Sequence, residues 1–183
     1  MNKLQICTTS LMLLAFVLTN TSLSEENDAI EKQKESKKAK QAQVIFNKIK
    51  SLQGEWISTE GEHKGQVALS VSIVAAGSAV VEREFPGTSE EMITIYHLDG
   101  EDVLLNHYCM LGNQPRMKAK LGDSDNTILF EFVGVTNVAS KDDAHMHEGK
   151  LTFVDKDTIK SSWVLYKDGK SEGEHNFEMV RKK

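Results

Sequence analysis

The sequence contains few of the residues that cross-link or break a polypeptide. Its 183 residues include 2 cysteines, 2 prolines and 12 glycines. So few cysteines exclude a disulfide-rich mini-protein, and so few prolines and glycines exclude a collagenous or low-complexity chain. A mean hydropathy of −0.37 excludes a membrane protein with several spans. The composition, 39% hydrophobic and 27% charged, fits one soluble domain of ordinary size.

The N-terminus lacks an apolar run long enough to cross a bilayer. The run at residues 11–18, LMLLAFVL, follows the basic residue Lys3 and precedes the small residues of Ser22-Leu23-Ser24. This order is typical of a secretory signal peptide. We therefore expect residues 1–24 to be a signal peptide cleaved after Ser24, and the protein to be exported, either periplasmic or secreted. An uncleaved N-terminal anchor is the alternative, which the short apolar run disfavours.

Positive charge is scarce in the part of the chain that is expected to fold. From Gly54 onward there are 14 basic and 22 acidic residues, a net charge of −8. This balance excludes nucleic acid as a partner, because phosphate binding needs a basic surface. Cys109 is the only cysteine after the expected cleavage site, so no intramolecular disulfide can form. We expect its thiol to be either buried or reactive.

Residues 25–43 have no apolar face and are rich in charge. We expect a disordered, solvated leader that is helical at most transiently, with no membrane span after processing. Apolar residues then recur at helical spacing, and they predict a short amphipathic helix that ends at Gln53-Gly54. These residues are Val44, Ile45, Phe46, Ile49 and Leu52. The expected folded domain is thus 44–183.

From Gly54 onward apolar residues alternate with polar ones, and turn signals recur about every ten residues. The predicted strands lie at Trp56, 67–73, 79–85, 92–98, 103–110, 116–121, 127–133, around His145, 151–154, 159–166 and 174–181. Asp99-Gly100 and Asp168-Gly169 are suited to two-residue hairpin turns. No helical crossover separates the strands, so parallel pairing is disfavoured. The sequence predicts an all-β fold, an antiparallel up-and-down β-barrel of about ten strands.

The two ends of the strand region carry a resemblance. Gly54-Glu55-Trp56 opens the first predicted strand, and Arg181 ends the last. This pattern resembles the lipocalin-like (calycin) barrels, in which the tryptophan of a Gly-x-Trp motif packs near an arginine of the final strand and closes the barrel bottom. A guanidinium over an indole is a favourable cation–π contact. The resemblance implies structural roles for Gly54, Trp56 and Arg181.

The stretch 90–117 carries a second resemblance, to a family of uncharacterised exported bacterial proteins with a lipocalin-like or nitrobindin-like barrel. The shared pieces are Tyr96-His97-x-Asp99-Gly100, His107-Tyr108-Cys109, Gly112-Asn113-Gln114-Pro115-Arg116-Met117 and His145-Met146-His147. The match covers most of residues 54–181. It implies a fold, and the family brings no settled activity.

The fold itself carries the leading functional hypothesis, because a small barrel has room for one small ligand. We expect a small, mainly apolar ligand in the interior. Six residues are predicted to line or gate its polar end: His97, His107, Tyr108, Asn113, Gln114 and Arg116. For the loop at 112–115, the alternative is a wide turn whose amides cap neighbouring backbone groups. For the whole domain, the alternative is a filled barrel that acts as a structural or interaction module.

Histidine and thiol side chains support a second hypothesis, a bound metal or haem. His107, Cys109, His145 and His147 could hold Zn or Cu through imidazole and thiolate ligands. Haem needs only one axial histidine, for which His97, His107, His147 and His175 are candidates. Nitrobindins bind haem through a histidine. Hydrogen-bonded interior side chains are the alternative interpretation of the same residues.

Evidence for an enzyme is sparse. There is no Gly-x-Ser-x-Gly, His-Glu-x-x-His or glycine-rich phosphate motif. Cys109 and His107 lie two apart on one predicted strand and point in parallel, so an inert thiol is favoured over a nucleophile. We place Glu82, Glu84 and Glu131 at solvent-facing strand positions and name no catalytic residue.

Overall fold

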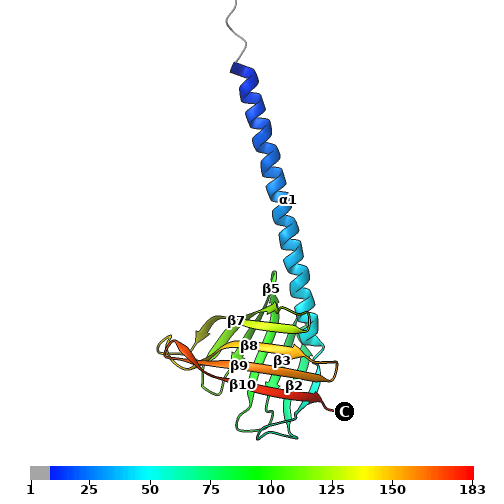
Figure 1. Cartoon of the computed structure of the whole chain (residues 1–183), viewed down its shortest axis with the longest axis vertical. Helices are drawn as coiled ribbons and strands as arrows, with labels where there is room; N and C mark the ends of the chain where they lie inside the picture. The colour runs from blue at the N-terminus through cyan, green and yellow to red at the C-terminus, as the bar shows by residue number, and fades with distance from the viewer. Residues whose placement is uncertain (1–8) are drawn as a thin grey trace, which may run out of the picture. The chain divides into compact units, whose positions relative to one another are not determined.

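The computed structural model describes residues 9–183, with side chains from residue 26 onward. One long helix precedes ten strands in these residues (Figure 1). The elements are α1 (Thr9–Lys50), β1 (Gly54–Ser58), β2 (Val67–Val74), the 3-10 turn η1 (Ala75–Gly77), β3 (Ala79–Glu84), β4 (Met92–Asp99), β5 (Asp102–Tyr108), β6 (Gln114–Leu121), β7 (Thr127–Thr136), β8 (His145–Phe153), β9 (Thr158–Lys167) and β10 (Lys170–Arg181).

The chain divides into two compact units, Met1–Lys38 and Ala39–Lys183. Residues 1–8 of the expected signal peptide lie outside the described residues, and cleavage after Ser24 stays a prediction. The structure differs from the expected disordered leader, because α1 continues through residues 25–43. No glycine or proline interrupts residues 1–53, and pairs such as Asp28 and Lys32 have the spacing that stabilises a helix. Among the described residues, no helix is both long and apolar enough to cross a membrane.

The strands of the second unit close into a barrel. Each strand pairs with its neighbours in the chain, and β1 pairs with β10. Every pairing is antiparallel. The predicted up-and-down barrel of about ten strands is therefore confirmed. The separate strands predicted around His145 and at 151–154 form one strand, β8, whose register shifts between Met146 and Glu148.

The last turns of α1 and Leu52, two residues beyond the helix, pack on one end of the barrel, which we call the helix-capped end. The side chains of Ile45, Phe46, Ile49 and Leu52 are all at most 3% exposed and belong to the core. The predicted amphipathic face is confirmed for these four residues. It is wrong for Val44, which is 47% exposed.

Arg181 contacts both the first strand and the residues just after the helix at the helix-capped end. Its guanidinium carbon lies 4.2 Å from the centre of the Trp56 ring, and the two residues are paired across β1 and β10. Arg181 donates to the carbonyls of Gln53 and Ser51, and the Trp56 indole donates to the carbonyl of Leu52 at 2.7 Å. Gly54 has a φ of +121°, a region that disfavours other residues. The contact implied by the Gly-x-Trp resemblance is thus present.

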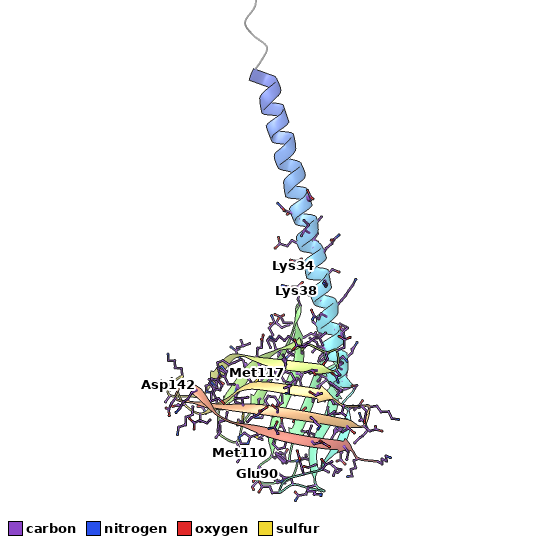
Figure 2. All side chains as sticks on the ribbon, viewed as in Figure 1. Lys34, Lys38, Glu90, Met110, Met117 and Asp142 are labelled. Atoms are coloured by element: carbon purple, nitrogen blue, oxygen red, sulfur yellow. The ribbon has the colours of Figure 1, made fainter. Side chains whose placement is uncertain are left out.

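The opposite end, which we call the loop end, is formed by the connections at 59–66, 85–91, 109–113, 137–144 and 168–169. Figure 2 labels one residue in each of three of these loops, Glu90, Met110 and Asp142. The connection between β9 and β10 is tight, because Asp168 and Gly169 both have positive φ, as a two-residue hairpin requires. The interior between the two ends contains Met117, which is fully buried.

Candidate functional site

Two glutamates of β3 face the barrel interior. Glu82 and Glu84 are 6% and 9% exposed, and they alternate with outward residues in phase with the fully buried Val80. The expected solvent-facing position is therefore wrong for both, whereas Glu131 is exposed and pairs with Lys120. Each face of this short strand carries a charged residue, so alternation alone cannot assign the inner face. Packing of Val80 in the core decides it.

The two glutamates belong to a buried hydrogen-bonded group that we call the interior polar cluster. Thr94 Oγ1 lies 2.7 Å from Glu84 Oε1 and 2.8 Å from His107 Nδ1. The hydroxyl of Tyr96 donates to Glu82 Oε2 at 3.3 Å. The five residues come from three consecutive strands, β3, β4 and β5, and none is more than 9% exposed.

The hydroxyl of Thr94 has one proton and two neighbours, so it couples the protonation of Glu84 to the tautomer of His107. In one arrangement Thr94 donates to an ionised Glu84, and His107 donates from Nδ1 to Thr94. In the other, a protonated Glu84 donates to Thr94, and Thr94 donates to Nδ1 of His107. The second arrangement has one proton more, on Glu84, and the ring proton of His107 lies on Nε2 instead of Nδ1, so His107 is neutral in both.

Burial sets the charge of this cluster. Removal from water raises the pKa of Glu84, although hydrogen bonds to Thr94 and Glu82 oppose the shift. Removal from water also raises the pKa of Glu82 well above its usual range, with the help of the charge on Glu84 and of the hydrogen bond between the two carboxyl groups. Burial lowers the pKa of His107 to about 4. His107 is therefore neutral near pH 7. Glu84 Oε2 is buried and has no hydrogen-bond partner among the described residues.

Aromatic rings form the wall beside the cluster. Trp163 of β9 stacks on Phe130 of β7 with ring centres 5.7 Å apart, and its ring also lies 6.1 Å from that of His107. Gly149 of β8 provides the space for this stack, because a Cβ there would lie 2.7 Å from the Trp163 ring and 3.1 Å from the Phe130 ring. The polar cluster and the aromatic wall thus meet through His107.

Several large apolar side chains near the loop end are only partly buried. Four large apolar side chains pack against the core there without being fully buried: Met92, Met146, Trp163 and Phe177. Met92 is paired with Glu84, and Phe177 is paired with Ser161 on the strand of Trp163.

The structure separates the four residues predicted to bind a metal. His107 contacts Thr94, whereas His145 and His147 contact each other through Nε2 and Nδ1 at 3.0 Å. The Cys109 thiol is buried, which raises its pKa, so the inert interpretation is favoured.

His145 and His147 form a second polar group near the loop end. His145 Nδ1 lies 2.7 Å from the carbonyl of Asp143, so it carries a proton and donates, and Nε2 accepts from His147. The His147 ring stacks between Phe132 and Tyr166, with centres 4.2 and 4.0 Å away. In this arrangement the hydrogen bonds and ring contacts hold His147 in place.

Among the described residues, one group of three has donors close enough for a metal ion. Its members are Glu62, His63 and Glu90, whose ligand atoms all lie within 4.8 Å of one another. His63 Nε2 is 3.2 Å from Glu90 and 3.5 Å from Glu62. Sequence reasoning missed this group, because its members lie in two loops with no metal-binding spacing.

The residues predicted to line a ligand are divided between the two faces of the wall. His107 faces the interior. His97, Tyr108 and Arg116 alternate with buried residues and lie on the outer face, and Tyr108 is 49% exposed. Among the haem candidates, His175 is also exposed.

The two amides bond within the loop end. Asn113 donates to the carbonyl of Ala144 at 2.7 Å, and Gln114 donates to the carbonyl of Gly112 and accepts from Thr136. These bonds agree with the alternative interpretation of the 112–115 loop, a wide turn whose amides cap backbone groups.

In comparisons with known proteins, no family model matches the sequence, and no curated protein is similar enough to match it. The structure defines the class: a closed, ten-stranded antiparallel β-barrel, consistent with a lipocalin-like fold. Its distinguishing feature is the interior polar cluster, of which the sequence predicted only His107 as a site residue.

Proposed function

We propose that this protein is an exported, lipocalin-like barrel that binds one small, mainly apolar ligand in its interior, with the polar end of the ligand at the interior polar cluster. The observation that carries the proposal is Glu84 Oε2, a buried acceptor without a partner. Leaving such a group unpaired costs about 1–3 kcal/mol, or more when it is charged. A ligand with a hydrogen-bond donor would remove that cost.

The surroundings of Glu84 support the same proposal. Met92 and Trp163 offer partly exposed apolar surface beside the cluster, and Phe130 stacks on Trp163. Pockets for small molecules combine such apolar walls with a few oriented polar groups. A purely structural barrel gains nothing from two buried carboxyl groups, since apolar residues in their place avoid the desolvation cost.

A neutral, apolar fluorescent dye, N-phenyl-1-naphthylamine, tests binding in the interior. We expect saturable binding of one dye per chain. Met92→Trp adds bulk beside Glu84 and should abolish it. Val133→Trp is the matched control, since Val133 is 54% exposed, and it should bind as the wild type does. Absence of saturable binding, or equal binding by the two variants, would contradict the proposal.

Export has its own test. We expect the exported protein to begin at Glu25, because small residues at Ser22 and Ser24 precede that bond. N-terminal sequencing and intact mass after expression with the native N-terminus measure this. A product that retains Met1 would refute cleavage.

A further inference from the structure

The interior polar cluster contains two carboxyl groups and no cationic side chain. The carboxylates that pair with lysine or arginine lie outside this cluster, at the barrel surface or in loops. They are Glu91, Asp102, Glu131, Asp157, Glu172, Glu178 and Glu55. The one basic group near Glu84 in the described residues is His107, whose Nδ1 lies 3.7 Å from Oε1. Any charge on Glu84 is therefore without a fixed counter-charge.

His107 does not supply that counter-charge at neutral pH. Its ring is 5% exposed, Nδ1 is engaged by Thr94, and burial keeps its pKa at about 4. The other strands packed against β3 do not supply it either. β2 places Leu69 and Val71 opposite the two glutamates, and β4 places Thr94 and Met92 opposite them.

The titratable groups that face Glu84 are accordingly Glu82, Tyr96, His107 and Cys109. The pKa values of Tyr96 and Cys109 are raised by burial, and that of Glu82 is raised well above its usual range. None of these groups is positive near pH 7. A buried carboxylate whose neighbours are all neutral attracts a cation strongly, because little water screens it.

The aromatic wall favours the same kind of ligand. The faces of Trp163 and Phe130 lie parallel, 4° apart, next to the His107 ring. Indole and phenyl faces attract cations through their quadrupoles and bury apolar groups. One ligand can use both properties if it joins a positive group to an apolar body.

We propose that the interior site selects a small organic cation, a protonated amine on an apolar or aromatic body, whose N–H donates to Glu84 Oε2 while its body packs on Trp163. This inference rests on the proposed function, because it requires that a ligand enters the barrel. It specifies the ligand class, which the fold alone leaves open.

Three probes with one aromatic body separate charge from burial: phenethylamine, 2-phenylethanol and phenylacetate. Isothermal titration calorimetry of the full-length protein at neutral pH gives each affinity. We expect phenethylamine to bind at least about tenfold more tightly than 2-phenylethanol, the ratio typical of a hydrogen bond to a charged group. We expect phenylacetate not to bind.

Two matched variants locate the charge. Glu84→Gln keeps the side-chain shape and should lower phenethylamine affinity to that of 2-phenylethanol, while 2-phenylethanol affinity stays within about threefold, the usual spread of such measurements. Glu131→Gln, at an exposed carboxylate on the neighbouring wall, should leave all three affinities unchanged. Persistence of the amine preference in Glu84→Gln would overturn the inference.

The wild type alone provides a further measurement if Glu84→Gln does not fold. Phenethylamine affinity should fall as the pH drops and Glu84 takes up a proton, and 2-phenylethanol affinity should not. Equal affinities for the amine and the alcohol at neutral pH refute the cation inference but leave interior binding intact. Failure of both probes and of N-phenyl-1-naphthylamine to bind refutes both proposals.

Discussion

Gly149→Ala perturbs the aromatic wall at a single atom. The new Cβ would lie 2.7 and 2.8 Å from two atoms of the Trp163 ring and 3.1 Å from Phe130, closer than carbon atoms approach without displacement. Trp163 is held by its stack on Phe130, so the ring has to tilt away from both partners. Overpacking of this kind costs about 1–3 kcal/mol. The same change should alter the emission of Trp163, because its contact with His107 is lost.

Urea unfolding measures this effect. With a slope of about 1–3 kcal/mol/M for a domain of this size, the midpoint should fall by roughly 1 M. Gly134→Ala is the matched control, since a Cβ there meets only the end of the Arg116 side chain, at 3.8 Å. It should be neutral or slightly stabilising, because alanine restricts the unfolded chain. The reasoning is refuted if Gly149→Ala matches the wild type in midpoint and emission, or if both variants lose stability equally.

Three further predictions concern the barrel end, the buried histidine and the thiol. Arg181→Ala should lower the free energy of unfolding in urea by about 2–4 kcal/mol, because it removes the cation–π contact with Trp56 and leaves two carbonyls without their donor. Lys182→Ala, at an exposed ion pair, should lower it by less than about 1 kcal/mol. Equal losses would contradict the role of Arg181. The pKa of His107 falls from 6.5 to about 4 on folding, so the unfolded state takes up a proton first as the pH falls. Between these pH values the free energy of unfolding of the wild type should fall by up to about 3 kcal/mol relative to that of His107→Gln. A difference between the two proteins that is independent of pH would be inconsistent with a neutral buried ring. Cys109 should react with a thiol reagent at least about a hundredfold more slowly in the folded protein than in urea, because burial raises the pKa of the thiol and blocks access to it. Comparable rates in the two conditions would show an accessible thiol.

The barrel was predictable from the sequence because its signals are local. Alternation in 67–73 and the dipeptide Asp168-Gly169 each fix a strand or a hairpin without reference to the remainder of the chain. The boundary error at β8 has a physical cause. The register shift between Met146 and Glu148 interrupts the alternation that joins His145 to Phe153.

The interior polar cluster was not predictable in the same way. Val80, Glu82 and Glu84 share one face of β3, whereas Val81 and Arg83 share the other, so either assignment buries a charged residue. The contact of Val80 with the core, which decides between the faces, depends on strands distant in the sequence. A strand with charge on both faces is nevertheless a signal of a polar interior, and it is one that sequence reasoning could have used.

The Trp56–Arg181 contact joins the first strand of the barrel to its last strand in chain order. Until β10 is available, β1 and β9 each present an unpaired edge, and the carbonyls of Ser51 and Gln53 lack their donor. Closure therefore cannot proceed alongside synthesis from the N-terminus, as it can in a protein built from local repeats. The same dependence makes loss of β10 equivalent to loss of the barrel.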